Sequence, residues 1–433
     1  MKPWRTERAA LRRLAVLALV LALAGASCIE VARAGSAGEG AQHFSSEGLA
    51  RVSDFIRNEV ASGKIPGAIL LIQQHGRPVY DKNFGVRDVA TELSMSADTI
   101  FRLYSMSKPI TSVAAMMLVE DGKLHLDDPV AKFIPAFAEM KVGVEKKDET
   151  GKVTLALEPL KRSITIEDLL RHTSGITYGF YGDSLVRKLY ADADLFNGDL
   201  TNAELVDRIA RLPLVEQPGT LWDYGHSTDV LGRVIEVISG KTLFQFVKER
   251  LLDPLGMTDT AFYVSDETKR PRIAEPMPND RSISPTTPLR DPMTPRKAES
   301  GGAGLVGTIG DYARFAQMLL NGGTFEGRRY LKPETLALMA SDHTRGVARD
   351  YLYYPGETSG FGLGFAVRTS VPPNTSWPLG EYRWDGVGGT FFFIDPVDDM
   401  FGIFMVQTPS ERGRIQLALK KLIYGAMGRG PAP

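Results

Sequence analysis

The stretch Phe101-Arg102-Leu103-Tyr104-Ser105-Met106-Ser107-Lys108 places a hydroxyl group three residues ahead of a lysine, at the start of an apolar helical pattern. Residues three apart on a helix share a face, so the side chains of Ser105 and Lys108 can come within hydrogen-bond reach. A serine becomes a good nucleophile when a base removes its proton, and a neutral lysine can be that base. Burial or a neighbouring cation would lower the pKa of Lys108 from about 10.4 toward neutrality.

The tetrad alone leaves two interpretations open. A Ser-x-x-Lys spacing occurs by chance about once in a chain of this length, and this one is the single instance in the sequence. In the first interpretation, Ser105 only caps the helix and Lys108 is solvated. In the second, the free N–H groups at the helix N-terminus stabilise an oxyanion beside Ser105.

Composition indicates an ordinary soluble globular protein, because 43% of the 433 residues are hydrophobic and 24% are charged. A chain of this length can form two cores, or one large domain with an insertion. The formal net charge is −1, with acidic and basic residues interspersed. This pattern gives no indication of a nucleic acid or an anionic membrane surface as partner.

Residues 1–34 have the features of a signal peptide: a basic leader, an apolar run over 14–24, and a small-x-small site that ends at Ala34. The apolar run is too short to span a bilayer, which favours cleavage near Ala34 over a membrane anchor. We therefore expect an exported protein, periplasmic or secreted, with no stable membrane insertion after cleavage. Lipidation at Cys28 is a less favoured alternative, and the export route, Sec or twin-arginine, stays open.

No cofactor is expected. Cleavage at Ala34 would remove Cys28, the one cysteine, which excludes disulfides, cysteine nucleophiles and zinc–thiolate sites. The six histidines include no pair at His-x-x-x-His spacing, which argues against a metal site.

Hydrophobic periodicity predicts strands near both ends of the chain and helices between them. Helices are predicted over 49–60, 105–120, 166–171, 202–212, 227–239, 243–252, 308–320 and 412–427, and strands over 68–73, 78–84, 361–369, 383–394 and 400–407. Consecutive strands joined by tight turns favour an antiparallel sheet. The predicted fold class is α/β (α+β), an antiparallel sheet flanked by the N- and C-terminal helices and interrupted by a mainly helical insertion.

The predicted domains follow from this order of elements. Beyond the signal peptide, residues 35–104 and 295–433 form an α/β domain, and residues 105–294 form a helical domain that carries the nucleophile helix. The proline-rich segment 271–295 is expected to be a long irregular loop. Together with segment 178–197, it is the expected wall of the substrate pocket.

Further segments accompany the tetrad in a fixed order. They are Ile166-Glu167-Asp168-Leu169-Leu170-Arg171-His172-Thr173-Ser174-Gly175, Pro218-Gly219-Thr220-Leu221-Trp222-Asp223-Tyr224, Asp253-Pro254-Leu255-Gly256-Met257, Gly301-Gly302-Ala303-Gly304-Leu305 and Trp384-Asp385-Gly386-Val387-Gly388-Gly389-Thr390. In this order they resemble the serine β-lactamase-like superfamily, specifically its branch of class C β-lactamases and family VIII carboxylesterases. The resemblance covers residues 45 to 425 approximately and implies a β-lactamase/transpeptidase-like fold.

The resemblance also implies roles. Ser105 matches the acylating serine, Lys108 the motif lysine, and Tyr224 the tyrosine that relays a proton between nucleophile and leaving group. The backbone N–H groups of Ser105 and Val387 match the oxyanion hole, whose two donors would stabilise a developing oxyanion.

Two departures from the β-lactamase pattern affect the expected substrate. Tyr224-Gly225-His226 stands where β-lactamases carry Tyr-x-Asn, and a histidine donates a hydrogen bond only in the right tautomer. Trp384-Asp385-Gly386 stands where they carry Lys-Thr-Gly, so the cation that would bind the β-lactam carboxylate is missing. His226, Trp384, Asp385 and Gly386 are the expected substrate-binding residues.

The sequence therefore predicts an exported serine hydrolase that cleaves a small-molecule ester or amide through an acyl-enzyme on Ser105, esterase-like in its preference. Alternatives within the enzyme class are a β-lactamase, a D-amino-acid peptidase, or transfer of the acyl group to another hydroxyl. An alternative outside it is a non-catalytic envelope protein that binds peptidoglycan or acyl ligands. The oligomeric state stays open.

Structural roles are the alternative for each companion residue. Tyr224 and Trp384 could be core residues, and His226 could cap the following helix instead of lining the pocket. His172 is expected to be structural, at a helix end and turn. A Ser-His-Asp triad through His172 or His226 is disfavoured, since the sequence has no Gly-x-Ser-x-Gly elbow.

Overall fold

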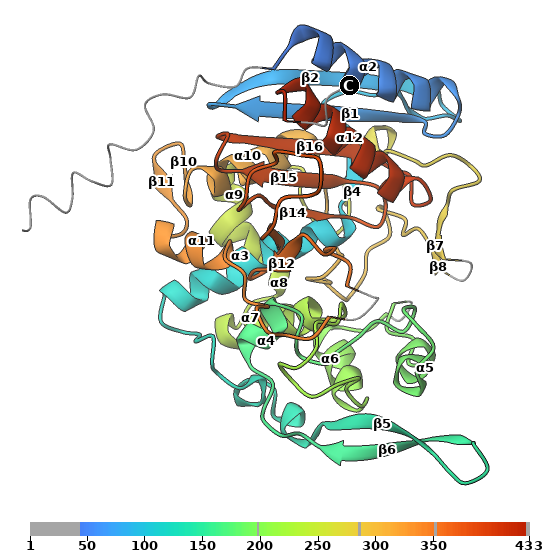
Figure 1. Ribbon diagram of the computed structural model, residues 1–433, viewed down its shortest axis with the longest axis vertical. Helices are drawn as coiled ribbons and strands as arrows, with labels where there is room; N and C mark the ends of the chain where they lie inside the picture. The colour runs from blue at the N-terminus through green and yellow to red at the C-terminus, as the bar shows by residue number, and fades with distance from the viewer. Residues whose placement is uncertain (1–43, 197–198, 285–286, 350–352, 430–433) are drawn as a thin grey trace, which may run out of the picture. The chain divides into compact units, whose positions relative to one another are not determined.

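An eight-stranded antiparallel sheet carries the fold, with strand order β12-β13-β14-β15-β16-β1-β2-β3 (Figure 1). Its strands are β1 (Gly67–Gln74), β2 (Arg77–Asp88), β3 (Leu93–Ser94), β12 (Ser359–Phe361), β13 (Ala366–Arg368), β14 (Tyr382–Asp385), β15 (Phe391–Asp395) and β16 (Met400–Val406). The computed structural model describes residues 44–196, 199–284, 287–349 and 353–429. The predicted signal peptide lies outside these residues, and none of the helices within them is long and apolar enough to cross a membrane.

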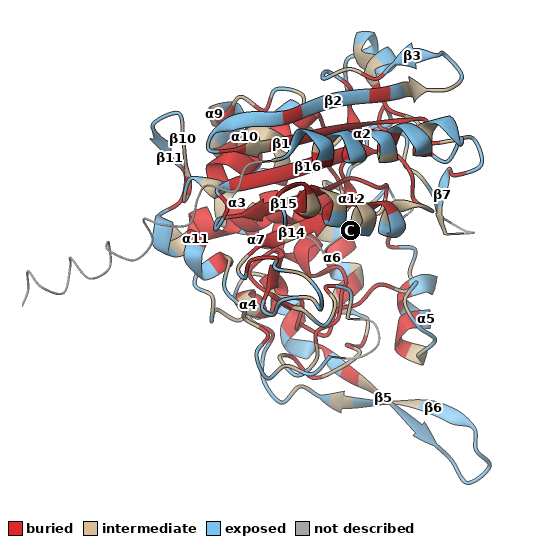
Figure 2. Ribbon diagram, turned by 45° about the horizontal axis from the view of Figure 1, so that its top comes forward, coloured by how far each residue is buried: buried red, intermediate tan, exposed pale blue. Residues whose placement is uncertain are grey.

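Both faces of the sheet are covered by helices, because its central strands are apolar on both sides. On β1, Ile69 and Leu71 face one hydrophobic cluster and Leu70 and Ile72 face another, as the alternation of a strand requires. The first cluster includes α10 (Ile309–Leu320), and the second includes α2 (Ser46–Ala61) and α12 (Arg412–Ala426). Figure 2 shows the buried colour in the middle strands and the exposed colour along β2 and the outer side of α2.

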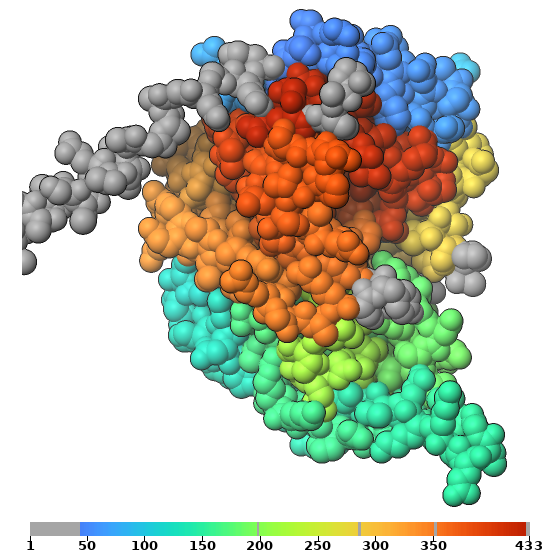
Figure 3. Space-filling model, viewed as in Figure 1, coloured from blue at the N-terminus to red at the C-terminus, as the bar shows by residue number. Residues whose placement is uncertain are grey.

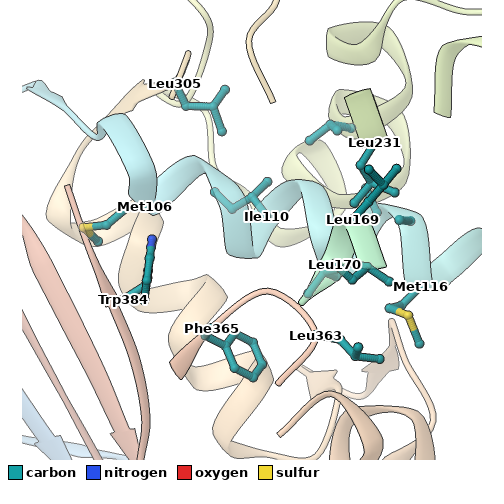
Figure 4. Close-up of a cluster of buried hydrophobic side chains, with 14 of the residues drawn as sticks. Met106, Ile110, Met116, Leu169, Leu170, Leu231, Leu305, Leu363, Phe365 and Trp384 are labelled. Carbon is teal, nitrogen blue, oxygen red and sulfur yellow. The ribbon is translucent and has the colours of Figure 1, made fainter. Parts of the chain in front are cut away.

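Helix α3 (Ser107–Glu120) runs through the interior, and all of its residues from Ser107 to Leu118 are buried. It packs against α7 (Ser227–Ser239), which also contacts α4 (Ile166–Leu170) and α6 (Asn202–Ala210). Figure 4 shows this packing, with Met106 near Trp384 at the start of the helix and Met116 near Leu170 and Leu363 toward its other end. Helix α3, which follows the predicted nucleophile, is therefore packed tightly between the sheet and the helical region.

The remaining elements are short. The helices and helical turns are η1 (Tyr104–Met106), η2 (Val130–Lys132), η3 (Pro135–Glu139), α5 (Leu185–Asp192), α8 (Leu243–Val247), η4 (Lys248–Leu252), α9 (Asp253–Leu255), η5 (Glu267–Arg272) and α11 (Pro333–Met339). The two-stranded pairs are β4 (Phe101–Arg102) with β9 (Val306–Gly307), β5 (Lys141–Lys147) with β6 (Val153–Pro159), β7 (Ser282–Ser284) with β8 (Thr287–Pro288), and β10 (Thr324–Phe325) with β11 (Arg328–Arg329). The β5–β6 hairpin extends away from the rest of the described chain, whereas the C-terminal helix α12 packs beside α2 (Figure 3).

The predicted fold class is confirmed, and two predicted strands need correction. Segment 361–369 forms the hairpin β12–β13, in which the Gly362 N–H donates to the Phe365 carbonyl at 2.9 Å. Segment 383–394 likewise forms two paired strands, β14 and β15, separated by a glycine-rich turn. The residues from Phe44 onward form one compact unit, and the division into an α/β and a helical domain stays a prediction.

Candidate active site

Ser105 lies in the 3-10 turn η1, directly before α3, and its surroundings fix this turn from several sides. Ahead of it, β4 pairs with β9, and the Leu103 N–H donates to the Leu305 carbonyl at 3.0 Å. Behind it, the Met106 carbonyl accepts a hydrogen bond from the Tyr312 hydroxyl at 3.1 Å. Tyr104 adopts a φ of 46°, which is unusual for a residue other than glycine. Ser105, the predicted nucleophile, therefore stands on a strained turn that the surrounding structure enforces.

Lys108 is buried with 1% of its surface exposed and lies next to Ser105. Its Nζ donates to Ser105 Oγ at 3.2 Å, to Tyr178 Oη at 3.1 Å and to the Gly302 carbonyl at 2.8 Å. Burial lowers the pKa of Lys108 to about 7, although the charges of Asp229 and Asp385 oppose the shift. Near neutral pH a large fraction of Lys108 is thus uncharged and able to accept a proton.

Tyr224 completes the group around Ser105. Its ring centroid lies 4.5 Å from Lys108 Nζ, and its hydroxyl accepts a hydrogen bond from Trp384 Nε1 at 3.1 Å. Burial raises the pKa of Tyr224 well above 10, and its hydrogen bonds with Ser105 and Trp384 only partly oppose this rise. The phenol is therefore protonated at neutral pH and can donate its proton.

The turn after β14 is pressed against the backbone that leads to Ser105. A Cβ on Gly386 would lie 2.3 Å from the Leu103 carbonyl oxygen, and a Cβ on Gly388 would lie 3.0 Å from the Tyr104 ring. Glycine is therefore required for this close approach. Val387 stands between the two glycines, and its N–H donates to none of the described residues. This position and this free donor fit an oxyanion hole.

Asp385 makes no hydrogen bond to Lys108 among the described residues, but belongs to a buried polar cluster with Tyr354 and residues of α12. Its carboxylate accepts hydrogen bonds from the Tyr354 hydroxyl, from Gln416 Nε2 at 3.2 Å and from Arg412 Nη1 at 3.5 Å. Trp384, in contrast, is buried and reaches the site through Tyr224. Of this tripeptide, the structure brings Trp384 and Gly386 close to the residues around Ser105.

His226 occupies the N-cap position of α7, but its side chain makes no capping hydrogen bond. Its Nδ1 pairs with Asp229 Oδ2 at 2.9 Å, and its buried Nε2 has no partner among the described residues. Burial would raise the pKa of Asp229, but the hydrogen bond with His226, the charge of Lys108 and the hydrogen bond from Ser300 lower it to about 2. The ionised Asp229 accepts the Gly302 N–H at 3.0 Å, and the Gly302 carbonyl accepts from Lys108. His226 is thereby linked to the lysine through a buried network.

His172 lies behind Tyr224 in an aromatic environment, with its ring centroid 4.8 Å from that of Tyr224 and 5.5 Å from that of Phe361. Burial lowers the pKa of His172 well below 6.5, so the ring is neutral. Neither His172 nor His226 makes a hydrogen bond to Ser105 in the described parts of the chain. The geometry of a Ser-His-Asp triad is therefore not formed.

Two residues of this group were not singled out by sequence. Tyr178 belongs to the predicted pocket wall and accepts the Lys108 hydrogen bond, and Asp229 organises His226 and Gly302. An aromatic run follows the His-Thr-Ser-Gly segment, and this could have drawn attention to Tyr178. Asp229 follows His226 by three residues at the start of a predicted helix, and this spacing could have indicated that the two side chains interact.

Replacing Tyr178 by phenylalanine is expected to lower kcat/KM by about tenfold, because one net hydrogen bond to Lys108 is lost. The phenol oxygen accepts from the ammonium form, so its loss disfavours the charged lysine and shifts the acid limb of the pH–rate profile to lower pH. The measurement is kcat/KM for an activated ester between pH 5 and 9. A tenfold loss with an unmoved acid limb would mean that Tyr178 acts only through packing.

The family model described as Beta-lactamase matches residues 52–424. Protein Rv1367c of Mycobacterium tuberculosis is 36% identical over 81% of this chain and 88% of its own length. The lovastatin esterase of Penicillium rubens is 30% identical over 80% of this chain and 90% of its own length.

Among solved structures, EstCE1, a hydrolase with promiscuous acyltransferase activity, superimposes with a TM-score of 0.72. It is 27% identical, and the match covers 88% of this chain and 99% of EstCE1. These matches extend over nearly all of the described residues and include the segment around Ser105. The chain therefore belongs to the β-lactamase family and is an enzyme, a serine hydrolase of that fold.

Proposed function

We propose that the protein is an esterase-like acyl hydrolase that forms its acyl-enzyme on Ser105. The observation that carries the proposal is the position of Lys108, whose buried Nζ lies 3.2 Å from Ser105 Oγ and whose pKa is lowered to about 7. A lysine in this state can hold the serine proton near neutral pH. The Tyr224 phenol, protonated and hydrogen-bonded to the same serine, supplies the matching acid.

The proposed reaction uses only residues of the chain. Ser105 Oγ attacks the ester carbonyl carbon while its proton passes to Lys108, and the N–H groups of Ser105 and Val387 stabilise the oxyanion. As the tetrahedral intermediate collapses, the bond to the leaving oxygen breaks and that oxygen takes a proton from Tyr224. Lys108 returns its proton to Tyr224. Water then attacks the acyl-enzyme by the same steps and releases the acid.

A fluorophosphonate probe tests this proposal directly, since it phosphonylates an activated serine irrespective of the natural substrate. We expect a mass increase of one probe adduct on the tryptic peptide that contains Ser105, and no adduct in Ser105→Ala. Ser107→Ala is less suitable as a control, because Ser107 Oγ accepts the Leu305 N–H at 3.0 Å. Ser410→Ala, at an exposed position, is better matched and should label as wild type does. Labelling of Ser105→Ala to the same extent as wild type would contradict the proposal.

The identity of the side chain at position 384 favours an ester over a β-lactam as the substrate. Trp384 is buried and its Nε1 is already bonded to Tyr224, so it offers no cation to a substrate carboxylate. The similarity to the lovastatin esterase supports the same choice. The similarity to EstCE1, a hydrolase with promiscuous acyltransferase activity, supports acyl transfer to an acceptor other than water as a side activity.

We therefore expect kcat/KM for p-nitrophenyl acetate to exceed that for nitrocefin by at least about a hundredfold, the order of discrimination that one lost charged contact supplies. Steady-state assays on the same preparation, with active sites counted by the fluorophosphonate probe, make the comparison. Comparable values for the two substrates would identify a β-lactamase instead.

A further inference from the structure

Four aromatic side chains lie next to one another, three from the segment between α4 and α5 and one, Phe196, from the segment after α5. Tyr178 stacks on Phe180 at 5.0 Å and 14°, Phe180 lies 4.6 Å from Tyr181, and Phe196 lies 5.7 Å from Phe180. Phe196 also contacts Tyr178 at 5.6 Å. We call this group of Tyr178, Phe180, Tyr181 and Phe196 the aromatic shelf.

The shelf has a buried end and an exposed end. Tyr178 is buried, whereas Phe180 is 47% exposed and Phe196 is 40% exposed. They are the two exposed phenylalanines among the residues that the structure describes. Exposed large apolar rings that adjoin one another commonly mark a binding surface.

The buried end of the shelf adjoins the proposed catalytic group. Tyr178 Oη lies 3.1 Å from Lys108 Nζ, which is itself 3.2 Å from Ser105 Oγ. Phe196 packs at 4.8 Å on the ring of His226. The apolar surface thus continues from the immediate neighbourhood of the nucleophile to solvent.

Charged groups near the shelf are already engaged elsewhere. Arg187 pairs with Asp223 beneath it, and Arg296 donates to the Phe196 backbone carbonyl at 3.0 Å. Within the described ranges, no arginine or lysine lies over the ring of Phe180 or Phe196. The exposed rings of Phe180 and Phe196 therefore offer apolar contact, whereas the nearest ammonium group, that of Lys108, lies over the ring of Tyr178 at the buried end of the shelf.

We propose that the aromatic shelf binds the acyl group of the substrate and selects apolar acyl chains longer than acetyl; this rests on the proposed acyl-enzyme at Ser105. The leaving group is assigned to the side of Trp384, because the hydroxyl of Tyr224, the proposed acid, is hydrogen-bonded to Trp384 Nε1 at 3.1 Å and Trp384 is not part of the shelf. An acyl chain that lies on Phe180 and Phe196 removes apolar surface from water. Each buried methylene is then worth about fourfold in kcat/KM.

The test is the ratio of kcat/KM for p-nitrophenyl butanoate to that for p-nitrophenyl acetate. Two extra methylenes should make this ratio about fifteenfold in wild type. In the double variant Phe180→Ala/Phe196→Ala the ratio should fall to near one. The double variant Phe180→Leu/Phe196→Leu keeps apolar side chains at both positions, so its butanoate-to-acetate ratio should stay close to that of wild type. Leu157→Ala on β6, a residue that is 60% exposed, should leave the ratio unchanged.

Several results would overturn the proposal. A wild-type ratio near one, or an undiminished ratio in the double alanine variant, means that the shelf does not bind the acyl chain. A second series varies the alcohol of butanoate esters. If the double variant changes the dependence of kcat/KM on alcohol length but not on acyl length, the shelf binds the leaving group. Fluorophosphonate labelling separates these failures from failure of the catalytic proposal, because an acyl-site error leaves Ser105 labelled in wild type and variants alike.

Discussion

Replacing Lys108 by methionine is expected to lower kcat/KM by about 10³-fold, within the range that a general base contributes. Methionine has nearly the same length and no titratable group, so Ser105 keeps its surroundings and loses its proton acceptor. In wild type, kcat/KM should be lost as the pH falls through about 7, the pKa to which burial lowers that of Lys108. The residual kcat/KM of Lys108→Met should not show this fall near pH 7. Stopped assays between pH 5 and 9 measure both effects.

The same substitution is expected to stabilise the protein. The pKa of Lys108 is about 7 in the folded state and about 10.4 in the unfolded state. Between these values the unfolded chain binds one more proton, so the free energy of unfolding of wild type rises with pH across this window. Lys108→Met should remove this contribution to the slope and unfold at higher urea concentration at pH 7. If the free energy of unfolding of Lys108→Met rises with pH between 7 and 10 as steeply as that of wild type, Lys108 is not a buried, neutral lysine in the folded state.

Lys420 provides a matched control, because burial lowers its pKa to about 7 as well. It pairs with the buried Glu381 beside α12, remote in sequence from Ser105, and is not part of the proposed mechanism. Lys420→Met should leave the acid limb of the pH–rate profile in place. It should lower stability by about 3 kcal/mol, because Glu381 loses a buried partner.

Replacing Gly386 by alanine is expected to lower kcat by about 10² to 10³-fold, the loss that follows removal of one oxyanion donor. The new Cβ would lie 2.3 Å from the Leu103 carbonyl oxygen and 2.6 Å from Thr390 Oγ1. A backbone carbonyl cannot yield like the end of a flexible side chain, so the turn must move and carry the Val387 N–H away from Ser105. Gly413→Ala on α12 is the control, since nothing lies within 4 Å of its Cβ position. Full kcat in folded Gly386→Ala would contradict the role of this turn.

How far the sequence predicts the fold depends on the range of the interactions involved. Helix α7 and strand β16 were predicted closely because their apolar patterns follow from their own burial. The strand break at Gly386 was missed because apolar residues continue on both sides of it; the glycines in between were the signal of a turn. The β5–β6 hairpin was also missed, since β5 is rich in lysine and both strands are only partly buried.

The same distinction applies to the site. Ser105 and Lys108 are neighbours on one helical face, so sequence spacing sufficed to bring them together. Tyr224 and Trp384 required the ordered set of segments, because they meet the serine only through tertiary packing. Contacts such as Lys108 with Tyr178 and with Gly302 join residues 70 and 194 positions apart, and local pattern carries no information about them.

The sheet joins the two ends of the described chain, because β1 pairs with β16 and the Ser45 N–H donates to the Ala426 carbonyl. The backbone before Ser105 is fastened by residues that follow it by about 300 positions: Gln407 Oε1 accepts the Arg102 N–H, and Thr390 bonds to the Leu103 carbonyl. Such long-range closure makes folding slow. During synthesis, a chain in which β16 has not yet been made lacks the β1–β16 pairing and the hydrogen bond from Gln407 that hold the backbone before Ser105. Hydrolytic competence should therefore arise only at the last step of folding, so that recovery of turnover after denaturation reports completion of the native state.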